Sequence, residues 1–340
     1  MSVAKTIHVA LASDENYFEG LLTTAWTIVR NCSRPQSIIF HILDGGISKS
    51  SFDYLQHRIC RWGAQINSHY IDQDDNFGSF KAYHGSGRMT YARLLLPDLL
   101  PHISHIIYTD VDIIWVADIA ELWDSLDPTA VIHYVPSQHT IKAELDWFAN
   151  HNLSFEYGNR FCAGMIAINL TKFRQEKLHI KMLDAIVSSN GDVPCVDETV
   201  LNAFTFWRKD RQFLDGRWQH MSFGRKEPLE PKGFTLHFGT DAPWQSIHKY
   251  HHLLTDQHLI WHRFHAEARQ ISTWKSLRMP NGPFDIIACR TIFLLARYLP
   301  PVRAALRLAL ILRGKKQNLA SLDLYMQPFD IRKVDRRLLP

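Results

Sequence analysis

The sequence has little cysteine, no long uncharged apolar run and no strong charge of either sign. Its five cysteines are scattered and form no C-x-x-C pair, which argues against a disulfide framework or a cysteine zinc site and favours a reducing, cytoplasmic setting. The opening stretch MSVAKTIHVALAS predicts neither a signal peptide nor a membrane anchor, because it has one lysine and no long apolar run. The net charge of +4 is too small to indicate nucleic acid, so we expect no nucleic-acid partner.

Glycine-rich phosphate-binding motifs are also missing. No G-x-x-x-x-G-K-[ST] pattern occurs in the sequence. Gly85-Ser86-Gly87 lacks the third glycine of G-x-G-x-x-G, because Thr90 stands there, and no strand leads into it. We interpret this stretch as a flexible loop. With 46% hydrophobic and 21% charged residues, the 340-residue chain has the composition of a globular protein of one large or two smaller domains.

Apolar strand-like runs alternate with helical patterns from the start of the chain. The predicted strands span residues 7–12, 37–43 and 65–71, and the helices between them span 18–29 and 52–62. This order predicts a parallel, doubly wound sheet, whose ligands lie at the carboxyl ends of the strands. Beyond it we expect a polar loop at 72–87, a helix through Tyr91 and Leu96, strands at 130–135, 161–170 and 234–238, and helices at 171–189 and 197–206.

The run IIYTDVDIIW, residues 106–115, reads as a buried strand interrupted by Asp110 and Asp112. Buried carboxylates need a partner or a metal, and carboxylate oxygens suit Mg²⁺ or Mn²⁺, which bridge to substrate phosphates. We therefore favour a metal or phosphate role over a purely structural pair. Asp72-Gln73-Asp74 repeats the D-x-D pattern in a polar loop, where a solvated surface is the simpler interpretation.

Histidines gather in one later region: His248, His251, His252, His258, His262 and His265. A solvated helical surface explains them more simply than a metal cluster does. His237 differs, because it ends a predicted strand and precedes a phenylalanine and a glycine. An imidazole beside two carboxylates would complete a three-ligand manganese site, but spacing alone leaves this role open.

Six segments, in a conserved order from Ile7 to Trp244, resemble glycosyltransferase family 8. Members of that family are retaining enzymes that use nucleotide sugars, and the similarity is greatest to the bacterial lipopolysaccharide galactosyl- and glucosyltransferases. The segments are ALASDENY (10–17), MTYARLLLPDLLP (89–101), YTDVD (108–112), FCAGMIAINL (161–170), DETVLN (197–202) and HFGTDAPW (237–244). The resemblance implies an α/β, GT-A-like nucleotide-sugar-binding fold with a mostly parallel central sheet, in a catalytic domain spanning residues 1–280.

The resemblance also implies roles for individual residues. Asp110, Asp112 and His237 would hold Mn²⁺ (or Mg²⁺), while Asp197 and Glu198 would be catalytic residues at the donor sugar. The nucleotide-sugar-binding residues would be Ala12, Asp14, Asn16, Tyr17, Arg93, Val111, Cys162, Ala163 and Gly239. Within this set, Tyr17 is suited to stack on a base and Asp14 to accept from its ring N–H. The alternatives are an exposed helix charge for Arg93, and acids at a helix start for Asp197 and Glu198.

The sequence departs from the family pattern at several positions. Cys162 stands where the family usually has asparagine, and Glu198 where it usually has glutamine. Ala242 replaces a lysine that would contact the diphosphate, a charge-assisted contact worth roughly 1.5–3 kcal/mol. Lys249 is a candidate replacement for that cation. The segment 132–138 also lacks an aspartate that the family often carries.

The implied reaction moves a hexose from UDP-galactose or UDP-glucose to a hydroxyl of a glycan or glycolipid acceptor with retention. The expected setting is synthesis of lipopolysaccharide core or another surface glycan. A metal-dependent nucleotidyltransferase would also use paired aspartates, and a non-catalytic nucleotide-sugar-binding protein would tolerate the departures at Cys162 and Ala242.

Residues 281–340 form a predicted basic, amphipathic helical tail. Between Phe284 and Gln317 its arginines and lysines recur without an acid after Asp285, and Pro300-Pro301 divides it in two. No apolar run approaches the roughly 20 residues of a spanning helix. We expect each half to lie on an anionic membrane surface with its arginines toward the headgroups, which would place the protein peripherally on the cytoplasmic face of the inner membrane. The alternative is a pair of helices packed on the catalytic domain.

Overall fold

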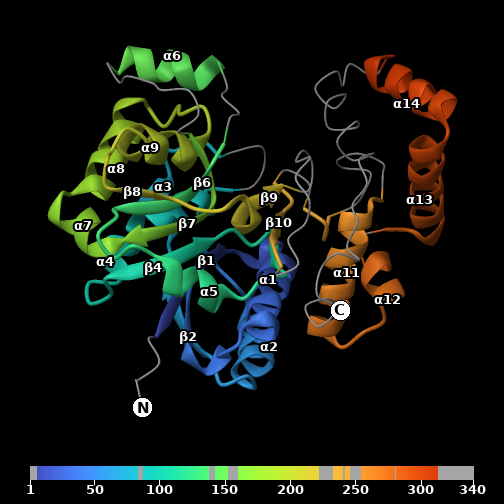
Figure 1. Ribbon diagram of the computed structural model, residues 1–340, viewed down its shortest axis with the longest axis horizontal. Coiled ribbons are helices and arrows are strands. Elements are labelled where there is room, and N and C mark those ends of the chain that lie inside the picture. Colours follow the sequence, from blue (N-terminus) through green and yellow to red (C-terminus); the bar gives the residue numbers. More distant parts are fainter. Residues whose placement is uncertain are drawn as a thin grey trace.

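The computed structural model describes residues 6–82, 87–137, 142–151, 160–221, 233–239, 242–245, 254–279 and 281–312. Two sheets form its framework, one of seven strands and one of three. Helices cover both faces of the larger sheet. Helix α11 (Asp256–Arg269) lies beside α1 (Phe18–Asn31), and the helices that follow it lie farther from the larger sheet (Figure 1).

The central sheet has the strand order β3-β2-β1-β4-β7-β6-β8. Its strands are β1 (Ile7–Ser13), β2 (Ile38–Asp44), β3 (Gln65–Tyr70), β4 (His105–Thr109), β6 (Ile132–Pro136), β7 (Phe161–Asn169) and β8 (Arg211–Phe213). The first four strands run parallel, as do β6 and β8, whereas β7 is antiparallel to both β4 and β6. The prediction of a mostly parallel sheet is therefore confirmed.

The apolar run 106–115 is two strands rather than one. After β4 the chain turns through Asp110, Val111 and Asp112 and enters β5 (Ile113–Trp115). This strand belongs to the small sheet, where β10 (Thr235–His237) pairs with it and with β9 (His220–Met221). The aspartates thus lie in the turn between two sheets, at the carboxyl end of a central parallel strand.

Two large apolar clusters flank the central sheet. One packs α1, α2 (Lys49–Cys60) and α5 (Ile119–Ser125) against it, and includes Phe40, Trp115 and Met165. The other packs the helices of the opposite face, and includes Tyr91 and Tyr134. That face carries the 3-10 helix Met89–Leu95, α4 (Leu96–Leu99), α6 (Lys142–Asn150), α7 (Leu170–Gln175), α8 (Leu178–Ser188) and α9 (Val196–Thr205).

Three sequence predictions on this face need correction. The expected polar loop at 72–87 contains a short helix, α3 (Gln73–Phe77), because Asp72 accepts hydrogen bonds from the backbone of residues 74 and 75. The helix expected through Tyr91 is mostly a 3-10 helix. The helix expected at 171–189 is two helices, separated where Lys177 adopts a positive φ of 53°. Gly85 and Ser86 lie outside the described residues.

The histidine-rich segment is not a solvated surface. α11 (Asp256–Arg269) carries His258, His262 and His265, and all three are buried. His262 and His265 each lie 2.8 Å from the Ser276 hydroxyl of α12 (Thr273–Arg278), and His265 also bonds Glu19 of α1. These rings pack α11 against its neighbours, which sequence patterning did not reveal. His248, His251 and His252 lie outside the described residues.

The predicted helical tail is observed as α13 (Pro283–Tyr298) and α14 (Pro300–Leu312), which are separated at Leu299 before Pro300-Pro301. Arg290 and Arg297 share a face, as expected, but both bind Asp256 of α11 at 2.6 Å instead of facing outward. No described helix combines the length and the apolar character needed to cross a membrane. Residues 313–340 lie outside the described part, and the domain boundary at 280 stays a prediction.

Candidate functional site

Helix α1 holds the turn that carries the two aspartates. The buried Thr24 hydroxyl lies 2.8 Å from the carbonyl of Val111 and 2.7 Å from that of Ile113. The Thr27 hydroxyl accepts from the backbone N–H of Trp115 at 3.0 Å. Gly20 allows the close approach, because a Cβ there would lie 2.7 Å from the Val111 carbonyl oxygen. The turn is therefore held in place by α1, which presents small and hydroxylated residues to it.

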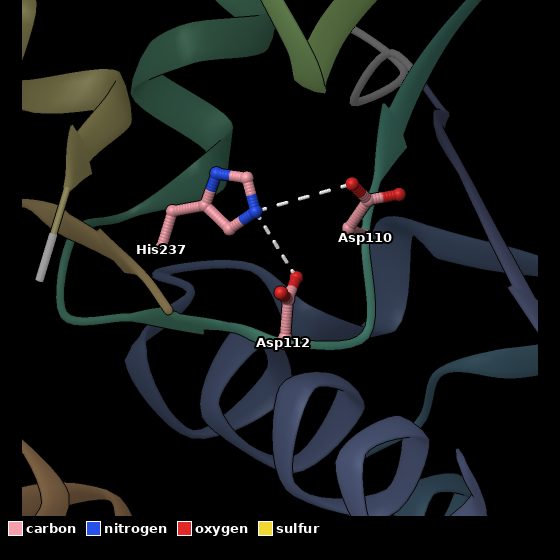
Figure 2. A group of neighbouring side chains, drawn as sticks. All are labelled: Asp110, Asp112 and His237. Atoms are coloured by element: carbon pink, nitrogen blue, oxygen red, sulfur yellow. Dashed lines mark ion pairs between the residues drawn. The ribbon is translucent and has the colours of Figure 1, made fainter. Parts of the chain in front are cut away.

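Asp110, Asp112 and His237 converge as predicted (Figure 2). The imidazole Nε2 lies 3.2 Å from Asp112 Oδ1 and 4.0 Å from Asp110 Oδ2. The three side chains come from the turn after β4 and from the end of β10, whose backbone is bonded to the turn through Phe238 N–H and the Asp112 carbonyl at 3.0 Å. Two segments far apart in the sequence thus bring together three side chains that could hold a metal ion.

The chemistry of this group fits a divalent cation. Asp112 Oδ1 is buried and lies 3.2 Å from His237 Nε2 without a well-formed hydrogen bond, which leaves a lone pair for a ligand. Burial raises the pKa of Asp110, although Arg93 opposes this. Burial alone would lower the pKa of His237, but the Asp112 carboxylate and the Cys162 side chain together outweigh it and raise that pKa well above its ordinary value. Two carboxylates and an imidazole suit Mn²⁺, and the cation and a proton compete for the imidazole.

The start of β7 shapes the space around His237. A Cβ on Gly164 would lie 2.3 Å from the His237 Cε1 atom, so only glycine leaves room for the ring. The Gly164 carbonyl also accepts from the Asp110 N–H at 2.7 Å. The Cys162 sulfur lies 3.8 Å from His237 Nδ1, and burial raises the pKa of that thiol.

Arg93 is buried at 3% exposure, so the alternative of an exposed helix charge is wrong. Its guanidinium binds Asp110 at 2.8 Å and Asp197 at 2.9 Å, and also donates to the Ala163 carbonyl. The Tyr108 ring lies under it, 4.1 Å from the ring centroid. Its contact with the donor stays a prediction, and in this structure Arg93 ties Asp110 of the D-x-D turn to Asp197 of α9.

Asp197 and Glu198 begin α9, as the helix-start alternative has it, but each also pairs with a different arginine. Asp197 is 1% exposed, binds Arg93 and accepts from Thr90, and burial raises its pKa to about 7. Glu198 binds Arg160 and accepts from the Ala163 N–H at 2.9 Å. Their catalytic roles stay predictions.

The residues predicted to hold the base and ribose follow β1. Ala12 is buried near the strand end, and Asp14 caps the 3-10 helix Glu15–Tyr17 by accepting from Tyr17 N–H at 3.2 Å. Asn16 is exposed, and the half-buried Tyr17 ring lies edge-on to Trp244, with centroids 5.6 Å apart. The carboxyl end of β1 thus offers polar groups and an aromatic ring beside the D-x-D turn.

The segment that departs most from the family pattern is only partly described. Gly239 has a positive φ of 62°, which suits glycine, and Ala242 is buried at 7% exposure. Lys249 and Gln138 lie outside the described residues. The described part of the chain therefore shows no cation in place of the missing lysine, since Arg93 and Arg160 are both engaged in ion pairs.

A model of glycosyl transferase family 8 matches residues 8–248. The chain belongs to glycosyl transferase family 8. The solved galactosyltransferase LgtC, in complex with donor and acceptor sugar analogues, superimposes with a TM-score of 0.61 at 20% identity and covers 78% of this chain and 96% of LgtC. The prediction of a GT-A-like fold is therefore confirmed.

Two curated relatives extend the comparison. Probable galacturonosyltransferase-like 2 of Arabidopsis thaliana is 29% identical over 53% of this chain and 57% of its own length. General stress protein A of Bacillus subtilis (strain 168) is 23% identical over 72% of this chain and 89% of its own length. The chain thus spans just over half of the plant relative and most of the bacterial one.

Sequence reasoning missed several residues that build the site. Thr24 supports the D-x-D turn, Gly164 makes room for His237, and Arg160 binds Glu198. Arg160 directly precedes the FCAG motif, and a charge beside that apolar run was a usable signal. Thr24 and Gly164 gave no such signal, because their importance depends on partners more than 70 residues away in the chain.

Proposed function

We propose that this family 8 member transfers a hexose from a UDP-sugar, UDP-galactose or UDP-glucose, to a hydroxyl of a glycan or glycolipid with retention. Synthesis of lipopolysaccharide core or another surface glycan is the proposed setting. The single observation that supports this most is the convergence of Asp110, Asp112 and His237 at the carboxyl end of the parallel strands, beside the polar residues that follow β1. Such a position is where open α/β sheets bind nucleotides.

Each group has a role in this proposal. Asp110, Asp112 and His237 hold Mn²⁺ or Mg²⁺, which as a Lewis acid neutralises charge on the departing UDP. Asp14 and Tyr17 bind the uracil. Arg93 fixes Asp110 in the orientation that binding needs, since it holds one oxygen of that carboxylate.

The donor sugar would lie at the start of α9. Asp197 would bind a sugar hydroxyl. Glu198 would stabilise the developing positive charge at the anomeric carbon or attack that carbon, because retention requires either a double displacement or departure and attack on one face.

A screen of UDP- and other nucleotide-sugars for Mn²⁺-dependent hydrolysis without acceptor tests the reaction class. UDP-galacturonic acid should be included, because a relative carries a galacturonosyltransferase-like name. We expect UDP and free hexose as products, and hydrolysis should stop when the metal is chelated. Release of pyrophosphate from a nucleoside triphosphate would instead indicate a nucleotidyltransferase. Metal-dependent UDP binding without turnover of any donor would indicate a non-catalytic binder.

We also propose that the tail helices contact an anionic membrane surface, with exposed apolar side chains supplying most of the contact. These large side chains are Phe284, Ile287, Ile292, Leu294, Leu295, Tyr298, Leu299 and Leu308. Arg290 and Arg297 are engaged with Asp256, so they contribute less to headgroup binding than their spacing suggested. Full-length protein should float with anionic vesicles at low salt, and Phe284→Ser/Tyr298→Ser should weaken flotation. Equal recovery of both proteins in the soluble fraction contradicts this placement.

A further inference from the structure

A buried arginine links the donor-side carboxylate to the interior of the protein. Arg160 is 4% exposed and precedes β7 directly. Its Nε atom donates to Glu144 of α6 at 2.8 Å, and its terminal nitrogen donates to Glu198 of α9. Glu144 is fully buried and also accepts from the Thr199 hydroxyl at 3.0 Å. One cation therefore connects three segments of the chain.

This cluster resembles a metal site but already contains its own cation. Glu144, Cys195 and Glu198 have ligand atoms within 4.8 Å of one another. The Arg160 guanidinium binds both of these carboxylates, so each already has a cationic partner and one of their two negative charges is compensated. The cluster is better explained as an ion-pair network that holds Glu198 in place than as a second metal centre.

This ion-pair network is connected to the metal-binding group through one peptide segment. Glu198 accepts from the Ala163 N–H, and Arg93 donates to the Ala163 carbonyl. The next residue, Gly164, contacts His237 and accepts from the Asp110 N–H. The segment that surrounds His237 is thus held from both sides, by Glu198 with Arg160 and by Arg93 with Asp110.

We infer that Arg160 is a positioning residue that fixes Glu198 as an ion-paired carboxylate at the donor sugar. This rests on the proposed function. Both Glu198 oxygens have a donor, Arg160 on one and the Ala163 N–H on the other, while the side chain remains 19% exposed. A carboxylate held in this way is a weak nucleophile and a well-oriented electrostatic group. Glu198 therefore stabilises positive charge on the sugar rather than forming a covalent bond to it. Arg160 supplies a countercharge to the Glu198 carboxylate. A glutamine at position 198 would be neutral and would not need one.

A mutant cycle tests the inference. Wild type, Arg160→Met, Glu198→Gln and the double variant are compared for kcat and donor KM in Mn²⁺-dependent hydrolysis of the UDP-sugar that wild type accepts. Because Arg160 acts through Glu198, Arg160→Met should lower kcat by about 100-fold, as expected for a misplaced reacting group, with little change in KM. In the Glu198→Gln background the same substitution should change kcat by less than about threefold.

Arg208→Met is a matched control. Arg208 also bridges two acids, Glu176 and Asp210, but it lies just beyond the other end of α9. Its loss should lower the melting temperature without the drop in kcat. Unchanged kcat in Arg160→Met, or an equal loss of kcat in both backgrounds, overturns the inference.

Thermal unfolding of the same four proteins separates this inference from the proposed function. If wild type hydrolyses no nucleotide sugar, the proposed function fails, and the unfolding cycle still tests the link between Arg160 and Glu198. In that case, additive losses of stability would show that Arg160 and Glu198 are not coupled, which overturns the inference. Coupled losses would show that Arg160 and Glu198 are linked structurally, without a role in catalysis.

Discussion

Two histidine environments in this protein shift the pKa of the imidazole in opposite directions. His237 lies between Asp112 and Asp110, and the Asp112 carboxylate and the Cys162 side chain together overcome the effect of burial and raise the His237 pKa well above the ordinary value. On the central sheet, His8, His41 and His69 form a row across β1, β2 and β3, with ring nitrogens 3.1 and 3.2 Å apart. Burial and the two flanking imidazoles lower the pKa of His41 to about 3.

Burial lowers the pKa of both rings, so the difference between them comes from their partners. Both rings are nearly inaccessible, at 4% and 3% exposure. Carboxylates make His237 part of a group that favours positive charge, which a metal ion can supply. The imidazoles around His41 favour a neutral chain of hydrogen bonds, whose tautomers are mutually dependent. The comparison predicts that changes at the first group alter ligand binding, and that changes at the second alter only stability.

The largest effect is expected when a carboxylate is removed from the first group. Asp112→Asn should lower donor turnover by at least about 1,000-fold, because the ligand set loses a charge and the departing UDP loses its compensation. The melting temperature should stay close to that of wild type. Asp74→Asn is the matched control, since Asp74 belongs to the second D-x-D sequence and is 92% exposed beside Arg88. Comparable losses in both variants would remove the distinction between the two motifs.

A smaller effect is expected from Gly164→Ala, which leaves every ligand in place. The added Cβ would meet the His237 ring at 2.3 Å and displace it, so Mn²⁺ affinity should fall by about 10- to 100-fold, as for other supporting residues of metal sites. Calorimetric titration with Mn²⁺ and UDP measures the loss. Adding Gly164→Ala to His237→Ala should cause little further loss. A full additional loss in the double variant would mean that the glycine acts elsewhere.

The histidine row should affect stability through pH. A folded-state pKa of about 3 against about 6.5 in the unfolded chain means that the unfolded state binds more protons below pH 6.5. Stability from His41 is therefore present above that pH and is lost as pH falls toward 3. Between pH 7.5 and 5.0 the loss should be at most about 2 kcal/mol. Urea unfolding of wild type and His41→Gln at both pH values measures it, and an equal pH dependence in the two proteins contradicts this account of the row.

The sequence indicated the site more clearly at positions where local pattern and side-chain chemistry agreed than at positions whose partners are distant in the chain. Asp110 and Asp112 stood out because charge interrupts an apolar run, and the alternation of strands and helices followed from hydrophobic periodicity. The apolar run 106–115 could not show that β4 and β5 belong to different sheets. That division depends on the pairing of β5 with β10, which lies more than a hundred residues further on. The histidines of α11 were wrongly placed on a surface because the Ser276 and Glu19 partners that bury them come from other helices.

The two arginines illustrate the same limit in the site itself. Their charges were visible in the sequence, but only the fold shows that Arg93 and Arg160 each bind one of two adjacent acids, Asp197 and Glu198. Pairing across elements is set by tertiary packing, and a single sequence carries no record of it.

Calorimetric titration of UDP into the full chain, with Mn²⁺ and then with excess chelator, tests the central claim most directly. If Asp110, Asp112 and His237 hold a divalent cation against the nucleotide diphosphate, tight binding should occur only in the presence of Mn²⁺, and Asp112→Asn should remove the difference between the two conditions. Equal affinity of the wild-type protein for UDP with Mn²⁺ and with chelator would contradict the claim.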